Sequence, residues 1–197
     1  SSADQLALLD AATNYDVYGS SGARLYATQK KVDNYYQAQE GWRAKAHSVG
    51  TAFIPATAPG FNDTGVRDGH TPLSRKLTAN DDFGSLFQAM VDKAVKLVDE
   101  ESNNLFMVTS WNEWHEDTQV EPTILSAPTR QDISSSGHLY TWNYSYEGYG
   151  FENLELIRRL LASDLPPVDT TLLEGGSAIR PPVIRIYPNP ANNTLHI

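Results

Sequence analysis

The sequence predicts an α/β fold in which short apolar strands alternate with amphipathic helices along a parallel sheet. Apolar residues recur at helical spacing in residues 23–47, 82–101 and 151–162, and short apolar runs stand at 51–56 and 105–108. Parallel strands need a crossover between them, usually a helix, and this alternation supplies it. We count roughly three strand–helix units in the 197 residues.

The first half of the chain predicts a strand or helix end, then a long helix, then a strand. Residues 6–17 run from an apolar segment into a polar loop that bears tyrosines. Residues 23–47 space their apolar side chains by three, four and seven, which predicts an amphipathic helix that Gly41 could break. Residues 51–56 are the next strand candidate.

The second half predicts a helix, a buried strand and a closing helix. Residues 82–101 have helical apolar spacing, and Asn80 or Asp81 before them is a suitable N-cap. The apolar run 105–108 follows as a buried strand, and residues 151–162 form the last amphipathic helix. The inward side chains of this helix are expected to be Leu154, Ile157, Leu160 and Leu161.

The loop after residues 105–108 holds the densest group of reactive side chains. It reads Trp-Asn-Glu-Trp-His-Glu from residue 111, so Glu113 and Glu116 stand three residues apart just past a predicted strand end. On an irregular loop this spacing can aim both carboxylates at one cavity, whereas strand pleating would send them to opposite faces. Cleavage of a glycosidic bond needs such a pair, one carboxyl group to protonate the departing oxygen and another to supply electrons. We therefore predict Glu113 and Glu116 as catalytic residues.

Other interpretations of this region stay open. Glu113 and Glu116 could be two solvated carboxylates on one face of a helix. His115 could hydrogen-bond the strand below it instead of a ligand, and Glu121 could be a third site acid or a member of a salt bridge or cap. Three later tyrosines are expected to pack against the fold, namely Tyr144, Tyr146 and Tyr149.

Two segments of the sequence resemble glycoside hydrolase family 99, the endo-α-mannosidases and endo-α-mannanases. Its signature loop reads Asn-Glu-Trp-His/Asn-Glu-Gly-Thr-x-x-Glu-Pro, and residues 112–122 depart from this order by Asp117 in place of Gly. Residues 59–67, Pro-Gly-Phe-Asn-Asp-Thr-Gly-Val-Arg, resemble the family segment in which a Pro-Gly-aromatic-Asp/Asn turn and a following arginine line the site. The resemblance implies that residues 1–165 are the C-terminal part of a (β/α)8 TIM barrel, which is incomplete because eight units take about 250 residues.

The resemblance also implies a mechanism that needs no metal or other cofactor. Glu113 removes the proton from the 2-hydroxyl of the mannose being cleaved, and this oxygen attacks the anomeric carbon. Glu116 protonates the leaving oxygen and then serves as base for the incoming water. A 1,2-anhydro sugar is the short-lived intermediate, and the outcome is retention of configuration.

Aromatic and polar side chains near the two acids are expected to bind the sugar. Tryptophan rings exclude water and offer flat faces for stacking. The tyrosines of the first loop could face the sugar or pack at the rim, and Arg67 could bind a hydroxyl or a carboxylate or form a surface salt bridge. The predicted substrate-binding residues are Trp111, Asn112, Trp114, Arg67, Tyr15 and Tyr18.

The C-terminal residues differ in composition from the rest. Residues 166–182 carry Pro and Gly and predict a linker. Residues 183–197 contain Tyr-Pro-Asn-Pro from Tyr187 to Pro190 and resemble the opening of a type IX secretion C-terminal sorting domain, a small β-sandwich. A Pro-Asn turn in another β domain is the alternative. The resemblance implies a protein that the type IX machinery of a Gram-negative bacterium secretes or displays on the cell surface. Both ends of the sequence are expected to be truncated, and the chain is expected to be inactive on its own.

The composition limits the partners of the protein. A net charge of −9 with no basic stripe argues against nucleic acid and against anionic membrane surfaces. No transmembrane run is present, and the absence of Cys excludes disulfides without excluding secretion. No metal site is predicted, because the histidines at positions 47, 70, 138 and 196 are scattered without metal-ligand spacing. A mannose-containing glycan is the expected partner.

We therefore predict a secreted, endo-acting α-mannosidase or mannanase. Two alternatives are a family-99-like glycosyltransferase, which an export signal disfavours, and a non-catalytic surface protein that binds carbohydrate. Asp117 raises the last alternative, because the usual Gly permits a positive φ. Asp tolerates that conformation better than most residues, so the enzyme is the favoured prediction.

Overall fold

The computed structural model describes residues 2–64, 67, 69–123 and 149–161 of the chain. Residues 1–160 form one unit, and residues 161–197 form a second unit of which only Leu161 is described. The predicted linker and sorting segment therefore lie outside the described residues. The elements are α1 (Ala3–Leu6), β1 (Ala11–Thr13), α2 (Val17–Ser21), α3 (Thr28–His47), β2 (Ala52–Ile54), β3 (Ala56–Thr57), α4 (Ser85–Ala94), η1 (Glu100–Ser102), β4 (Met107–Val108), η2 (Trp114–Glu116) and α5 (Glu152–Leu161).

All strand pairs among the described residues are parallel. β1 pairs with β2, with Ala11 opposite Ala52, and β3 pairs with β4, with Ala56 opposite Met107. β2 and β3 are consecutive pieces of one chain segment, separated by Pro55, whose ring nitrogen has no hydrogen to donate. Strands, helices and loops thus alternate as predicted, and the described strands do not close into a barrel.

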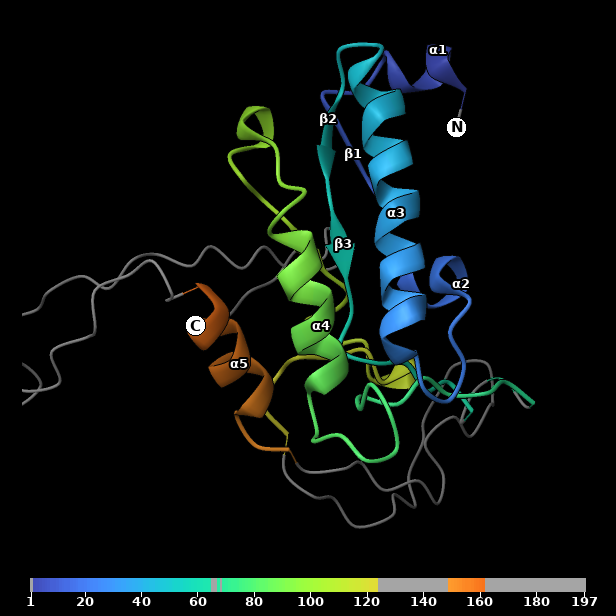
Figure 1. Cartoon of the computed structure of the whole chain (residues 1–197), viewed down its shortest axis with the longest axis vertical. Coiled ribbons are helices and arrows are strands. Elements are labelled where there is room, and N and C mark those ends of the chain that lie inside the picture. Colours follow the sequence, from blue (N-terminus) through green and yellow to red (C-terminus); the bar gives the residue numbers. More distant parts are fainter. Residues whose placement is uncertain (1, 65–66, 68, 124–148, 162–197) are drawn as a thin grey trace, which may run out of the picture. The chain divides into compact units, whose positions relative to one another are not determined.

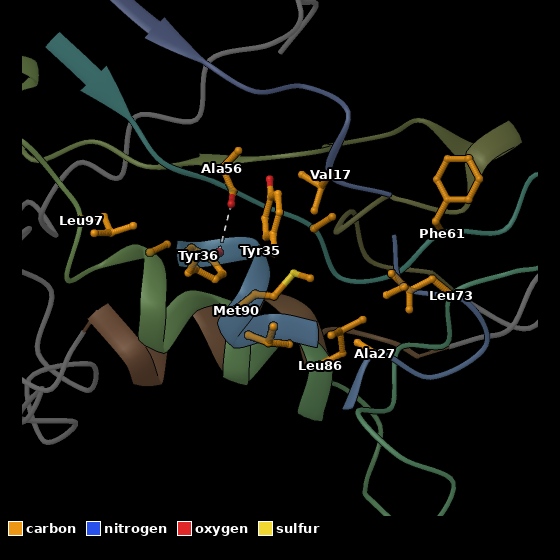
Figure 2. Close-up of a cluster of buried hydrophobic side chains, with 14 residues drawn as sticks. Val17, Ala27, Tyr35, Tyr36, Ala56, Phe61, Leu73, Leu86, Met90 and Leu97 are labelled. Atoms are coloured by element: carbon orange, nitrogen blue, oxygen red, sulfur yellow. Dashed lines mark hydrogen bonds between the residues drawn. The ribbon is translucent and has the colours of Figure 1, made fainter. Parts of the chain in front are cut away.

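A buried glutamine ties α3 to the strand just after Pro55. Gln39 is fully buried, and its Nε2 donates to the Ala56 carbonyl at 3.0 Å while its Oε1 accepts from the Ala56 N–H at 2.8 Å. The Tyr36 hydroxyl donates to the same carbonyl at 3.0 Å, as Figure 2 shows. These bonds satisfy backbone groups that the interrupted strand would otherwise leave unpaired in the core.

The main hydrophobic cluster lies between α3, α4 and β3 (Figures 1 and 2). Leu86, Met90 and Ala94 recur every four residues on α4 and are fully buried, so they present one stripe of the helix to α3. Burial of each larger side chain stabilises the fold by roughly 1.5–3 kcal/mol relative to exposure. The other members are Val17, Ala23, Ala27, Val32, Tyr35, Tyr36, Ala56, Ala58, Phe61, Leu73 and Leu97.

A second cluster uses a neighbouring stripe of α4. Phe87 and Val91 pack there with Val120 and with Leu156 of α5, and the aromatic ring of Trp111 lies against them. α4 is thus buried along two stripes, and it links the segment after β4 to the rest of the fold.

The helix boundaries differ from the predicted ones. α3 begins at Thr28 and not at residue 23, and it continues through Gly41, whose cost of about 1 kcal/mol at an exposed helix position is tolerable. α4 begins at Ser85 with Gly84 as its N-cap, in a left-handed conformation, so neither Asn80 nor Asp81 caps it. Residues 100–102 form a separate 3₁₀ turn.

Two predicted faces are also corrected. The run 105–108 is only partly buried, since Leu105 and Met107 are 43% and 44% exposed while Val108 packs on the second cluster. Successive strand side chains point to opposite faces, and one face of β4 is uncovered within the described residues. On α5, Ile157 and Leu160 pack on the second cluster as predicted, whereas Leu161 is exposed and Leu156, which was not predicted, is the buried leucine. Among the described helices, none is both long and apolar enough to cross a membrane.

Candidate active site

The segments that follow three strands meet at one pocket of about 380 Å³. Residues 15–19 follow β1, residues 58–61 follow β3, and residues 109–118 follow β4. The carboxyl ends of parallel strands lie at the same edge of a sheet, so their loops converge there. The lining residues are Tyr15, Asp16, Val17, Tyr18, Gly19, Ala58, Gly60, Phe61, Arg67, His70, Leu73, Thr109, Glu116 and Thr118.

The loop after β4 is closed by its own hydrogen bonds. The Ser110 N–H donates to the Thr118 carbonyl at 2.8 Å, and the hydroxyls of these two residues bond each other at 2.8 Å. The Ser110 Oγ also accepts from the Glu113 N–H at 2.9 Å. The strand ends at Val108, as the apolar run 105–108 predicts, and the loop turns through η2 so that Glu116 reaches the pocket.

Asp117 adopts the left-handed conformation that a glycine would favour. Its φ is 47°, and it ends η2 as the C-cap residue. Arg75 Nη2 donates to the Asp117 carbonyl at 2.9 Å and to its Oδ1 at 3.0 Å, and Gln119 Nε2 donates to the same Oδ1 at 3.0 Å. The departure from the usual Gly therefore keeps the backbone turn, and two side chains hold it.

A buried arginine supports the loop on the side away from solvent. Arg75 is 7% exposed, donates to the Gln119 carbonyl at 3.1 Å, and places its guanidinium 4.7 Å from the Tyr149 ring centre. The Tyr149 hydroxyl donates to the Glu121 carbonyl at 2.8 Å, and burial raises the pKa of this hydroxyl. Tyr149 packs as predicted, whereas Tyr144 and Tyr146 lie outside the described residues.

Glu116 is held by an arginine from the neighbouring loop. Arg67 Nη1 donates to Glu116 Oε1 at 3.1 Å and to Asp63 Oδ2 at 2.7 Å. These two carboxylates, Asp63 first, raise the pKa of the Arg67 guanidinium. The Asn62 N–H also donates to the Glu116 carbonyl at 2.7 Å. The loop after β3 is thus joined to the loop after β4 by backbone and side-chain bonds.

Asp63 and His70 also belong to this site and were not among the predicted site residues. The Asp63 side chain has no exposed surface, and His70 Nδ1 lies 2.9 Å from its Oδ2. His70 lines the pocket beside Glu116. A usable signal was present, because an Asp four residues before an Arg often marks an ion pair, and these positions stand at that spacing in the predicted site loop.

Both predicted tyrosines line the pocket. Tyr15 is 58% exposed, and partial burial, followed by the negative charges of Glu116 and Glu113, raises the pKa of its hydroxyl. The Tyr18 ring stacks on Phe61 with centres 3.9 Å apart, and its hydroxyl donates to the backbone carbonyl of residue 71 at 2.6 Å. Tyr15 is thus an exposed side chain of the pocket lining, and the Tyr18 ring forms a wall of the pocket with Phe61.

Four predicted site residues lie outside the pocket lining. Trp111 packs on the second cluster, and Asn112 is exposed. Trp114 is 51% exposed and donates from Nε1 to Glu121 Oε2 at 3.1 Å. Glu113 is half-buried, with His115 Nδ1 at 3.9 Å from its Oε1. The structure thus gathers Glu116, Arg67, Tyr15 and Tyr18 at the pocket and leaves the other four at its margin or in packing.

The residues that the structure describes contain no group of three or more His, Asp or Glu side chains that could hold a metal ion. The pocket lining includes two acidic residues, Asp16 and Glu116, together with a guanidinium, an imidazole and two phenol rings. Such a combination of acids, hydrogen-bond donors and aromatic faces defines a site suited to a neutral, hydroxyl-rich ligand.

Comparison with known proteins agrees with this class of site. Residues 7–133 match the family described as Glycosyl hydrolase family 99, and the chain belongs to this family. It is 30% identical over 101 residues to the mouse glycoprotein endo-alpha-1,2-mannosidase-like protein, which covers 49% of this chain and 21% of that protein. It is 35% identical over 79 residues to the human protein of the same name, and the match covers 40% of this chain and 16% of the human protein.

Further similarities cover short parts of longer proteins. The rat glycoprotein endo-alpha-1,2-mannosidase is 33% identical over 72 residues, which are 36% of this chain and 14% of that protein. The chain therefore spans between 14% and 21% of the length of these three relatives. Among solved structures, the GH99 endo-alpha-mannosidase from Bacteroides thetaiotaomicron superposes with a TM-score of 0.43 at 22% identity, covering 79% of this chain and 41% of that one.

Proposed function

We propose that the protein hydrolyses α-mannosidic bonds inside mannose-containing glycans. The observation that carries this proposal is the pocket at the strand ends, where Glu116 stands beside Arg67 and Tyr15. Membership of glycosyl hydrolase family 99 and the names of the relatives, glycoprotein endo-alpha-1,2-mannosidases, support the same substrate class. A mannosyl unit at this pocket would meet polar groups around its rim and the aromatic wall of Tyr18 and Phe61.

In the proposed mechanism, two acids act on one sugar from different sides. Glu113 takes the proton of the 2-hydroxyl, and this oxygen displaces the leaving group to give a 1,2-anhydro sugar. Glu116 gives its proton to the leaving oxygen and then removes one from the water that opens the ring, so configuration is retained. Glu116 and Tyr15 line the pocket, and Glu113 lies outside the lining on the same loop, so the scheme requires a sugar that extends from the pocket to Glu113.

Arg67 has a part in this scheme because a carboxyl group that acts as an acid must first lose its guanidinium partner. Arg67 is 51% exposed and shares one nitrogen between Glu116 and Asp63. We propose that Arg67 keeps its bond to the buried Asp63 when sugar binds and turns away from Glu116, towards a sugar hydroxyl. The acid is thereby released for proton transfer.

Substitution of the two acids tests the proposal. In the protein, Glu113→Gln and Glu116→Gln should each lower turnover of an α-1,2-linked mannoside by roughly 10²–10⁴-fold and leave its binding largely intact, because the amide keeps the shape and loses the proton chemistry. A substrate with an activated leaving group should rescue Glu116→Gln more than Glu113→Gln. Glu40→Gln on the exposed side of α3 is the matched control and should turn over normally. Near-normal turnover in either acid variant would contradict the assignment, and binding without turnover in the unsubstituted protein would favour a non-catalytic carbohydrate-binding protein.

We also propose that residues 183–197 begin a type IX sorting domain, joined by a linker at 166–182 to the catalytic residues 1–165. The proposal rests on the Tyr-Pro-Asn-Pro order from Tyr187 to Pro190. In a host with type IX export, the protein truncated after Asp169 should stay in the periplasm, and the untruncated protein should reach the surface or medium. Equal surface display of both forms would show that residues 187–190 are only a turn and not part of a sorting signal.

A further inference from the structure

The pocket contains the imidazole of His70, and the buried carboxylate of Asp63 fixes its orientation. His70 Nδ1 lies 2.9 Å and 3.1 Å from the two carboxylate oxygens of Asp63, and Asp63 has no exposed side-chain surface. A carboxylate only accepts hydrogen bonds, so Nδ1 carries the hydrogen of this bond. The tautomer of the neutral ring is therefore set, and its Nε2 bears a lone pair.

The ring is placed where a ligand of Glu116 can reach it. His70 lines the same pocket as Glu116, Arg67 and Tyr15, and 46% of its side chain is exposed. The Tyr18 ring lies beside it with centres 6.4 Å apart. Within the described residues, the ring hydrogen bonds of His70 all use Nδ1. Nε2, on the opposite edge of the ring, is therefore the atom that can bond a ligand in the pocket.

We propose that His70 is a substrate-contacting residue, whose Nε2 accepts a hydrogen bond from a sugar hydroxyl in the pocket, and that Asp63 is its positioning residue. This inference rests on the proposed function and adds a contact to it. Asp63 aims two groups at once, because it also holds Arg67, the partner of Glu116. A single buried carboxylate thus sets the positions of an acceptor at His70 and a donor at Arg67, which together suit neighbouring hydroxyls of one sugar ring.

Two isosteric substitutions separate this role from a purely structural one. Asn at position 70 places its amide near the position of Nδ1, so it keeps the hydrogen bond to Asp63 and loses the acceptor that faces the pocket. Gln places its amide near the position of Nε2, so it keeps the pocket side. A substrate-contacting role therefore predicts that His70→Gln binds sugar better than His70→Asn, and a structural role predicts the reverse order.

The test is binding of α-1,2-linked mannobiose, measured by calorimetry on the protein and on both variants. Loss of one hydrogen bond to the ligand should weaken binding about tenfold in His70→Asn, and His70→Gln should stay within about threefold of the unsubstituted protein. Thermal unfolding of each variant should show a folded state. In ¹⁵N spectra of the unsubstituted protein, the Nε2 resonance of His70 should move on titration with mannobiose more than Nδ1 does.

The outcomes distinguish the inference from the function on which it rests. Mannobiose binding with equal affinity in His70→Asn and the unsubstituted protein, or with the His70 ring signals unmoved, would overturn the inference and leave the proposed function standing. Failure of the unsubstituted protein to bind mannobiose would overturn both. Loss of turnover in Glu116→Gln together with tenfold weaker binding in His70→Asn would support both.

Discussion

Two buried aspartates in this fold have the same kinds of partner and different surroundings. Asp99 accepts from Arg43 Nε at 2.6 Å and bonds His47 Nε2 at 2.6 Å, and Asp63 accepts from Arg67 at 2.7 Å and bonds His70 at 2.9 Å. Neither aspartate has exposed side-chain surface. Residue type and burial alone therefore do not separate the two clusters.

The two clusters differ in where they lie along the strands. Asp99 lies near the start of β2, where its Oδ2 also accepts from the Phe53 N–H at 2.9 Å, and both of its side-chain partners come from α3. None of the three side chains lines the pocket that holds Glu116. The Asp63 cluster follows the carboxyl end of β3, and its arginine and histidine both line that pocket. The Asp99 cluster joins helix to strand, and we interpret the Asp63 cluster as a device that aims groups at a ligand.

The largest effect that sharpens this contrast is expected at the pocket. Asp63→Asn should lower turnover of an α-mannoside about 100-fold, because Arg67 and His70 lose their anchor and small displacements of catalytic groups are costly. Asp99→Asn is the matched control and should leave turnover per folded molecule within about threefold. Steady-state kinetics on folded protein, checked by circular dichroism, gives both values. Equal losses in the two variants would remove the distinction between the clusters.

The second effect concerns stability. Asp99→Ala should lower the free energy of unfolding by about 2 kcal/mol, since two charged hydrogen bonds are lost and the Phe53 N–H is left without a partner. The loss is moderate because Arg43 and His47 are 36% and 41% exposed and regain water. Urea unfolding measures it, with Glu40→Ala on the exposed face of α3 as a control. A change below about 0.5 kcal/mol would contradict a structural role for Asp99.

The third effect is a pH dependence of stability. Burial by itself raises the pKa of Asp99, but the bonds from His47, the Phe53 N–H and Arg43 outweigh it, so the pKa lies below its ordinary value. The unfolded chain then takes up the proton first, and the stabilisation is present above the ordinary pKa and is lost as the pH falls through the lowered one. Urea unfolding between roughly pH 5 and pH 2 should show a smaller loss in Asp99→Asn than in the unsubstituted protein. Parallel curves for the two proteins would be the contrary result.

The smallest effect is expected at the turn that Asp117 makes in the loop after β4. Asp117→Gly should change stability by less than about 1 kcal/mol, because Gly adopts the positive φ without strain while the bonds from Arg75 and Gln119 are lost. Asp117→Val should cost about 1–3 kcal/mol, since a branched side chain is strained in that conformation. Thermal unfolding ranks the two variants, and a Val variant as stable as the Gly variant would show that the turn does not depend on this conformation.

The order of strands and helices was predictable from the apolar pattern, and element boundaries were not. Gly41 looked like a helix break because Gly is a poor helix former, yet tertiary contacts of Tyr35, Tyr36 and Gln39 carry α3 through it. Gly84 was overlooked as a cap, since its left-handed conformation depends on the loop that precedes α4.

The candidate site was predictable where chemistry and strand ends coincide. Glu116, Tyr15 and Tyr18 were predicted from their positions after predicted strands and Arg67 from the resemblance of residues 59–67 to the family segment, and the structure brings the four to one pocket. Trp111 was predicted to bind sugar because of its flat ring, but this ring packs on the second cluster instead. The spacing of Asp63 and Arg67 was a usable signal of an ion pair, but the place of His70 at the pocket depends on how a turn-rich loop folds back, which the sequence does not reveal.

The central claim is that the pocket around Glu116 and His70 is where an α-mannoside binds. The most direct measurement is chemical-shift mapping of the isotopically labelled protein during titration with α-1,2-linked mannobiose. The account predicts that the signals of Tyr15, Arg67 and His70 move together and saturate at one affinity, while those of Arg43 and His47 stay in place. Saturating shifts at Arg43 and His47, with the pocket residues unmoved, would contradict it.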